Sequence, residues 1–284
     1  MIIVTGATGT LNGATVEHLL RRVPAGQIGV SVREPWRAEQ LARRGVRVRQ
    51  GTYDDPTALL HSFAGADQVL LVSSSDVGAD VVAQHRTAID AAVCAGAQRI
   101  FYTSTVGAGI DTPYPPLAIH AATEQYLADS GIAWTALRNG FFGNLEQLLG
   151  PWQSTGSIAK PADGPFPWVD RRDAAEAAAA ILTGDEVFDG PVDLFPSPVT
   201  LADFAAAASE LTGRRVERIV VGDEAWAIDA IANGMPESAA RFTLSMFQAV
   251  RSGHFGRFDP TLTRLLGRPP RNVADLLAEQ IESW

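Results

Sequence analysis

The sequence contains a single cysteine, Cys94, and this scarcity limits its chemistry. One thiol cannot form an internal disulfide or a cysteine-rich metal site. Because Cys94 lies in an alanine-rich segment with helical periodicity, we predict that it is a small buried core residue. The sequence also lacks a secretory leader and any apolar run near the roughly 20 residues that a membrane span requires. We therefore expect a cytoplasmic protein without a membrane partner.

Charged residues are few as well, at 19% of 284 residues, and acidic side chains outnumber basic ones by 32 to 23. The resulting net charge of -9 repels a nucleic-acid backbone, so we expect a small-molecule partner and no nucleic acid. An apolar fraction of 46% is typical of globular proteins and argues against disorder. The sequence leaves open whether two copies associate as a homodimer.

Short apolar runs alternate with helical segments through the first half of the chain. The predicted strands are 2–5, 27–32, 46–50, 68–72, 99–103 and 133–137, and helices are expected to begin near Leu11, Pro35, Pro56, Val77 and Leu117. Right-handed crossovers turn such an alternation into a doubly wound parallel sheet. We predict an α/β fold with a Rossmann-type domain at 1–138 and a smaller C-terminal α/β substrate lobe at 139–284. About 168–195 of the second part is expected to return to the Rossmann body.

The predicted helix ends carry suitable capping residues. Asp55 is expected to be an N-cap, and Gly96 and Gly131 stand where left-handed C-terminal caps occur. Thr200 and Asp203 have the spacing of a capping box for a helix that reaches residue 211.

A glycine-rich segment follows the first predicted strand and opens the first helix: Thr5-Gly6-Ala7-Thr8-Gly9-Thr10-Leu11-Asn12-Gly13. Gly6 permits a tight turn, Gly9 lets the backbone approach a pyrophosphate, and the first helical amides supply partial positive charge. We therefore predict nucleotide binding by Gly6, Thr8, Gly9, Thr10 and Leu11. Asn12 occupies the third small position, where glycine is usual, and an ordinary turn is the alternative interpretation.

The end of the second predicted strand bears on the choice of cofactor. Proteins specific for NAD place an acidic residue there for the ribose diol, whereas this chain has Arg33, followed by Arg37. A guanidinium can pair with a 2′-phosphate, so we predict that NADP(H) is preferred over NAD(H). The alternative is that both arginines are solvated residues before a surface helix.

Polar residues follow three further predicted strands. Ligands of open parallel sheets bind beyond the carboxyl ends of the strands, so these positions are suited to line a cofactor trough. The candidates are Thr52, Tyr53, Ser73, Ser74, Ser75, Thr103 and Ser104.

Later segments carry a family resemblance: Leu71-Val72-Ser73-Ser74-Ser75, Tyr102-Thr103-Ser104, the run from His120 to Gly131, and Leu137-Arg138-Asn139-Gly140-Phe141-Phe142. With the glycine motif, they make the chain similar to the NmrA-like atypical short-chain dehydrogenase/reductases, and within these to NAD(P)H-dependent quinone oxidoreductases. The resemblance implies that His120, Asn139, Gly140 and Phe141 lie at the cofactor, under a closing C-terminal lobe. Thr52 departs from the family pattern, in which an aspartate near the adenine is frequent.

Ordinary short-chain dehydrogenases use a Tyr-x-x-x-Lys pair as the proton donor, and this chain lacks it: the corresponding positions hold Pro116 and His120. Without that acid, the easier acceptors are those whose reduced product is a stabilised anion. We therefore predict an enzyme that transfers hydride from NADPH to a quinone or a similar aromatic, conjugated carbonyl compound. His120 is expected to supply a proton or, alternatively, only to bind the nicotinamide ribose, while Ser104, Thr105 or Asn139 hydrogen-bonds the acceptor oxygen.

Aromatic residues are frequent after the sixth predicted strand. They suit a flat apolar cleft for an aromatic acceptor, although they can equally form the core of the lobe: Phe141, Phe142, Trp152, Phe166 and Trp168. The remaining histidines show no metal-ligand spacing, so we predict no metal site.

Two other functions are compatible with the same residues. One is a biosynthetic enzyme that reduces, or rearranges without net redox, a polyketide-like aromatic intermediate. The other is a redox-sensing regulator that binds NAD(P) and a protein partner without turnover. The missing Tyr-x-x-x-Lys pair does not separate these possibilities, because quinone-reducing members of the family lack it too.

Overall fold

The computed structural model describes residues 1–76, 78–142, 145–253, 255 and 259–282. Seven strands form the main sheet in the order β3-β2-β1-β4-β5-β6-β8, and every neighbouring pair is parallel. Their bounds are β1 (Ile2–Thr5), β2 (Ile28–Val32), β3 (Arg47–Gln50), β4 (Gln68–Leu71), β5 (Arg99–Thr105), β6 (Ala133–Asn139) and β8 (Gly190–Leu194). The predicted Rossmann-type fold is confirmed, with the reversal of strand order between β1 and β4.

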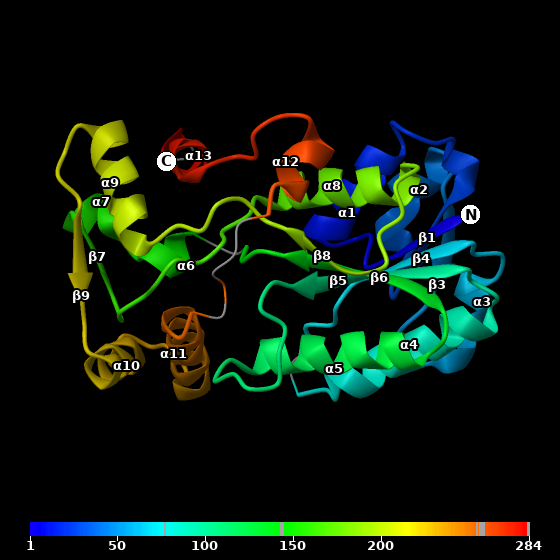
Figure 1. The fold of residues 1–284 in the computed structure, drawn as a ribbon, viewed down its shortest axis with the longest axis horizontal. Coiled ribbons are helices and arrows are strands. Elements are labelled where there is room, and N and C mark those ends of the chain that lie inside the picture. The colour runs from blue at the N-terminus through cyan, green and yellow to red at the C-terminus, as the bar shows by residue number, and fades with distance from the viewer. Residues whose placement is uncertain (77, 143–144, 254, 256–258, 283–284) are drawn as a thin grey trace.

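Helices cover both faces of this sheet (Figure 1). One face carries α1 (Thr10–Leu19) and α8 (Arg171–Thr183), which pack on Val4, Leu70 and Phe101. The other carries α3 (Pro56–Phe63), α4 (Val81–Cys94) and α5 (Pro115–Asp129), around Ile3, Val69 and other buried residues. Residues adjacent in a strand thus serve opposite cores, as strands buried on both faces require. We call this sheet and its helices the body.

Two helices begin later than predicted. The segment at Pro35 starts as a 3-10 turn (Pro35–Ala38) and becomes α2 only at Glu39–Arg43. Val77, near which a helix start is predicted, lies outside the described residues, and α4 begins at Val81 with the Asp80 side chain as its cap. Elsewhere the capping predictions are confirmed: Asp55 accepts hydrogen bonds from two amides of α3, and Thr200 with Asp203 forms a capping box.

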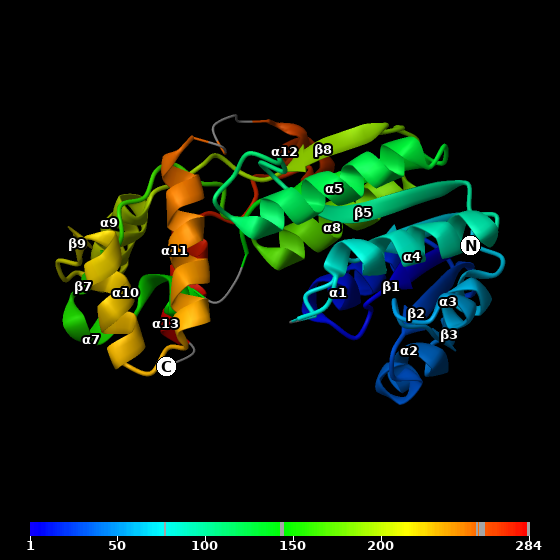
Figure 2. The ribbon, with the colours of Figure 1, turned by 90° about the horizontal axis from the view of Figure 1, so that it is seen from below.

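The remaining elements form a smaller unit, which we call the lobe, beyond the carboxyl ends of the strands (Figure 2). It comprises α6 (Leu145–Leu149), α7 (Trp152–Thr155), β7 (Ser157–Lys160), α9 (Leu201–Thr212), β9 (Glu217–Val220), α10 (Asp223–Ala232), α11 (Glu237–Arg251) and α13 (Val273–Glu282). Strands β7 and β9 pair in parallel. No helix within the described ranges is long and apolar enough to cross a bilayer.

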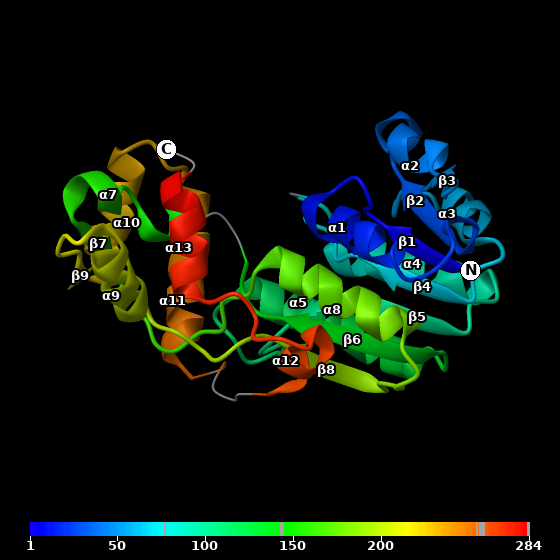
Figure 3. The same cartoon turned by 90° about the horizontal axis from the view of Figure 1, so that it is seen from above.

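The chain returns to the body twice after β6. The first return comprises α8 and β8, and the second is α12 (Thr261–Leu266), which packs beside α8 (Figure 3). Sequence analysis did not identify the second return. The domain boundary at residue 138 stays a prediction.

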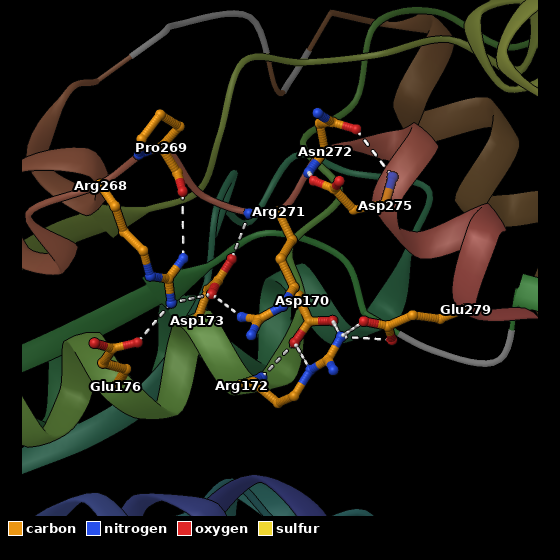
Figure 4. Close-up of polar contacts among 10 residues, drawn as sticks. All are labelled: Asp170, Arg172, Asp173, Glu176, Arg268, Pro269, Arg271, Asn272, Asp275 and Glu279. Atoms are coloured by element: carbon orange, nitrogen blue, oxygen red, sulfur yellow. Dashed lines mark hydrogen bonds and ion pairs between the residues drawn. The ribbon is translucent and has the colours of Figure 1, made fainter.

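A cluster of ion pairs joins the C-terminal segment to the start of α8 (Figure 4). The Asp173 carboxylate is fully buried and accepts hydrogen bonds from Arg268 at 2.8 Å and from the Arg271 backbone N–H at 2.6 Å. The Arg271 guanidinium also contacts it. Nearby, Arg172 pairs with Glu279 of α13 at 2.7 Å. Since α13 packs on α9 of the lobe, this cluster connects body and lobe.

The prediction of a buried Cys94 is wrong. Cys94 is exposed at the last position of α4. Ala88, Ile89, Ala91 and Ala92 form the stripe of this helix that packs on the sheet, and Cys94 faces away from it.

Candidate functional site

A cavity of 320 Å³ lies at the carboxyl ends of β1, β2, β3 and β4. It is lined by the glycine-rich turn, the end of β2 and the loops after β3 and β4. The predicted cofactor residues that meet there are Gly6, Thr8, Gly9, Arg33, Thr52, Tyr53, Ser73, Ser74 and Ser75. Thr10 and Leu11 lie in the first turn of α1 beside it. The other predicted residues lie in β5, α5, the end of β6 and the segment directly after β6: Thr103, Ser104, His120, Asn139, Gly140 and Phe141.

The glycine-rich turn has the geometry of an anion-binding helix start. Gly6 has a φ of 62°, and an added Cβ would lie 2.5 Å from Val72 Cγ1, so no other residue fits there. Gly9 is the N-cap of α1, and among the described residues no side chain caps this helix. The first-turn amides are therefore available to an anionic ligand.

Asn12 does not disturb this turn. Its buried side chain donates a hydrogen bond from Nδ2 to the Thr5 carbonyl at 2.8 Å, which ties the end of β1 to α1. The close approach that needs a glycine falls one position later, where an added Cβ on Gly13 would lie 3.0 Å from the Ala7 carbonyl oxygen. The substitution of glycine by Asn12 thus adds a hydrogen bond outside the cavity lining.

Tyr53 closes the floor of the cavity. Its hydroxyl donates to the Val72 carbonyl at 2.7 Å and lies 2.7 Å from Thr5 Oγ1. Burial raises the pKa of the Tyr53 phenol, so it stays protonated. This residue holds the end of β1 against the segment after β4.

A chain of hydrogen bonds runs from the cavity toward α5. The Ser74 backbone N–H donates to His85 Nε2 at 2.8 Å, so in the neutral ring the proton lies on Nδ1, 2.8 Å from Thr123 Oγ1. His85 Nδ1 therefore cannot accept from the buried Tyr102 hydroxyl, which lies 3.4 Å away. The Tyr102 hydroxyl lies 2.8 Å from His120 Nδ1, to which it can donate.

This chain favours one tautomer of His120. With Nδ1 accepting from Tyr102, the neutral imidazole carries its proton on Nε2. Burial lowers the pKa of His120 to about 3, and the neighbouring His85 and Arg138 act in the same direction. His120 is thus a neutral hydrogen-bond donor at physiological pH. The sequence alone predicts a histidine with an ordinary pKa near 6.5, which would be partly protonated there. Sequence analysis missed Tyr102 and His85, although Tyr102 lies in a segment that carries the family resemblance.

Strands β5 and β6 extend two residues beyond the predicted runs, so Thr105 pairs with Asn139 inside the sheet. The Ser104 hydroxyl donates to buried Glu124 at 2.6 Å, and Glu124 also binds the Arg138 guanidinium, with Nε at 2.9 Å. Since Ser104 has one proton, its predicted role as a donor to an acceptor would require it to leave Glu124.

Asn139 is almost fully buried at the end of β6. Its Nδ2 donates to the Leu137 carbonyl at 3.1 Å, while no donor in the described part of the chain reaches Oδ1. A buried carbonyl oxygen without a partner is costly, so this atom is suited to accept a hydrogen bond from a ligand.

A small apolar pocket of 10 Å³ lies between the end of β6 and the lobe. Phe141 and Trp168 line it together with Phe166 and residues of α6 and α11. Its volume is that of about one water molecule, so an aromatic acceptor requires it to widen. Trp152 is instead part of the lobe core, and Phe142 packs on the body core under Arg171. Trp152 and Phe142, predicted to line an acceptor cleft, thus belong to these cores and do not line the small pocket.

Lys160 is the sole lysine of the sequence, and it lies in β7 with Nζ bonded to the Gln147 carbonyl. No lysine can therefore assist a tyrosine near His120. Within the described ranges, no group of three or more histidine, cysteine, aspartate or glutamate side chains is placed to hold a metal ion.

Comparison with known proteins identifies the family. The model of the NmrA-like family matches residues 1–271. The chain belongs to the NmrA-like family. This NmrA-like protein is 36% identical to quinone oxidoreductase 2 of Escherichia coli strain K12, over 97% of this chain and 96% of that protein.

Two solved structures are similar over almost their full length. The NADPH-dependent quinone oxidoreductase of Escherichia coli, complexed with NADPH, has a TM-score of 0.91 and 34% identity, covering 99% of this chain and 100% of that chain. The triphenylmethane reductase of a Citrobacter species, complexed with NADP(H), has a TM-score of 0.89 and 30% identity, covering 98% and 99% respectively.

Proposed function

We propose that this NmrA-like protein is an NADPH-dependent oxidoreductase that reduces a quinone or a similar aromatic or conjugated carbonyl compound. One observation carries the proposal: a single cavity contains the uncapped start of α1 and the guanidinium of Arg33. The first suits a pyrophosphate and the second a 2′-phosphate. The names of the similar reductases support the class of acceptor.

The residues present fit a nicotinamide dinucleotide along the whole edge of the sheet. At one end, the glycine turn leaves backbone close to the cavity. At the other end, no donor among the described residues reaches Asn139 Oδ1, and the carboxamide N–H of a nicotinamide can supply one. We propose that Gly6, Thr8, Gly9, Thr10 and Leu11 hold the phosphates, and that Asn139, Gly140 and Phe141 face the nicotinamide end.

When bound, the reduced nicotinamide supplies a hydride to the acceptor. The protein has to stabilise the negative charge that then develops on the acceptor oxygen. We propose that His120 does so as a donor through Nε2–H, because its pKa of about 3 keeps the ring neutral. A reduced quinone is a stabilised anion, so its last proton can come from water and no strong acid is required.

The acceptor is expected to lie between His120 and the lobe, with Phe141 and Trp168 against its ring. Thr105, whose hydroxyl donates a long hydrogen bond of 3.4 Å to the Asn139 carbonyl, is a second polar group for this position. We further propose a cytoplasmic enzyme with a small-molecule partner and no nucleic acid, which the net charge of -9 supports. A homodimer is compatible with the proposal.

The test begins with titration of the purified protein with NADPH and NADH, followed by nicotinamide fluorescence. Simple quinones are then added while the absorbance of the reduced nicotinamide is recorded. We expect tighter binding of NADPH and quinone-dependent oxidation, which His120→Asn should slow without weakening cofactor binding. The matched control is His61→Asn on an exposed position of α3. Absence of cofactor binding, or binding without oxidation by any quinone, would contradict the proposed function.

A further inference from the structure

The arginine expected to select the 2′-phosphate already has a carboxylate partner. Arg33 Nη1 donates to Asp76 at 3.0 Å to Oδ1 and 3.3 Å to Oδ2. Both residues line the 320 Å³ cavity. Arg33 follows β2 and Asp76 lies in the segment after β4, while β1 and its glycine turn lie between these strands. The ion pair therefore spans the cavity above the turn.

A hydrogen bond from α4 holds the Asp76 carboxylate in this position. Gln84, a buried residue of α4, donates from Nε2 to Asp76 Oδ2 at 3.4 Å and to Asp54 Oδ1 at 3.0 Å. The other arginine of the cavity, Arg37, is paired as well, with Glu34 at 3.3 Å. Each guanidinium that could bind a 2′-phosphate thus has an acidic neighbour.

A 2′-phosphate and the Asp76 carboxylate would compete for one guanidinium. A phosphate that binds Arg33 through Nη1 has to displace Asp76, and a phosphate that binds through the other guanidinium donors lies close to a carboxylate of the same charge. The ribose of NADH has a neutral hydroxyl at this position, so neither cost applies to it. The Arg33 and Asp76 side chains are 69% and 37% exposed, so solvent limits the effect to a modest change in affinity.

We propose that Asp76 is a specificity-determining residue that competes with the 2′-phosphate for Arg33 and so reduces the preference for NADPH over NADH. The proposal rests on the proposed function, because it assigns a role to a residue of the same cofactor site. It gives the chain a cofactor preference weaker than Arg33 alone would produce.

The test uses the full-length variant Asp76→Asn and compares its dissociation constants for NADPH and NADH with those of the wild type. We expect NADPH to bind about three- to tenfold more tightly and NADH to change less than about twofold. Asp80→Asn is the matched control, since it removes one negative charge from the same segment outside the cavity lining and asparagine still caps α4. Titration with 2′,5′-ADP and 5′-AMP repeats the comparison without the nicotinamide half.

A double variant separates competition for Arg33 from other effects. In an Arg33→Met background, Asp76→Asn should tighten NADPH binding less than it does when Arg33 is present, because only the direct repulsion between carboxylate and phosphate is then relieved. Equal tightening of NADPH and NADH, no change, or weaker binding of NADPH by Asp76→Asn would each overturn the proposal while leaving the proposed function intact. If the wild type bound neither cofactor, the proposed function itself would fail.

Discussion

The hydroxyl of Tyr102 lies 2.8 Å from Nδ1 of His120, and a chain of hydrogen bonds leads from this pair through His85 to the Ser74 amide. The Ser74 amide occupies His85 Nε2, so His85 carries its proton on Nδ1 and cannot accept from Tyr102. Tyr102 can then donate to His120 Nδ1, which leaves the His120 proton on Nε2. A loop of the cofactor cavity thus favours Nε2 as the nitrogen of His120 that donates.

Tyr102→Phe is expected to lower kcat by about tenfold or more, because the removed hydroxyl no longer keeps the His120 proton on Nε2. The KM for NADPH should change little. Nitrogen NMR of the imidazole should show a mixture of tautomers in place of one. The control is Tyr126→Phe, which removes a hydroxyl of α5 that is bonded to Asp90 of α4. A variant with unchanged kcat and an unchanged tautomer would show that Tyr102 does not position His120.

The protein is expected to lose stability as the pH falls below about 6.5. Burial lowers the pKa of His85 to about 4 and that of His120 to about 3, whereas both titrate near 6.5 in the unfolded chain. Between these values the unfolded state binds more protons, so each histidine lowers the free energy of unfolding by up to about 1.4 kcal/mol per pH unit. Urea unfolding at several pH values measures the slope, which His120→Asn should reduce. A slope equal to that of wild type would contradict the buried neutral state.

The pH dependence of kcat/KM should show no inflection near 6.5. An ordinary catalytic histidine titrates in that range, but the lowered pKa keeps His120 neutral from neutral pH down to about 3. Initial rates at saturating NADPH, over the pH range in which the protein stays folded, provide the measurement. An ionisation near 6.5 that disappears in His120→Asn would indicate that His120 acts as an imidazolium acid.

Ser104→Ala should affect stability more than the chemical step. The Ser104 proton is bonded to Glu124, and a hydrogen bond to a charged group contributes about 1.5–3 kcal/mol. Loss of a direct donor to the acceptor oxygen typically costs about a hundredfold or more in kcat, and we expect a smaller loss here. Thermal unfolding and kcat measured together distinguish the two roles. A hundredfold fall in kcat in a protein of unchanged stability would favour direct catalysis by Ser104.

Asp173→Asn is expected to destabilise the fold by about 3 kcal/mol or more, because it leaves Arg268 and Arg271 at a site built for a buried carboxylate. The segment that contains them should also become more sensitive to limited proteolysis. Asp189→Asn is the control, since its ion pair with Arg99 is exposed on the aspartate side and should contribute less than about 1 kcal/mol. Equal losses in the two variants would mean that the cluster has no special role.

The sequence alone determined the features that depend on neighbouring residues. Alternating apolar runs located the first six strands but not β7, β8 or β9, Gly6 and Gly9 located the turn, and Asp55 located a helix start. Each of these features follows from a local constraint. A positive φ requires a glycine at that position, and the free amides at a helix start need a capping residue within a few positions. The fold and the cofactor edge could therefore be predicted before any contact was known.

Only the tertiary structure decided which distant groups meet. Asp76 reaches Arg33 across β1, and Asp173 reaches Arg271 from the opposite end of the C-terminal half. Likewise, the tautomer of His120 follows from a Ser74 amide on another loop. Such pairs are separated by tens of residues, and no local pattern specifies them. They form because strand order and helix packing bring these side chains within hydrogen-bond distance, and burial then requires that each polar group find a partner.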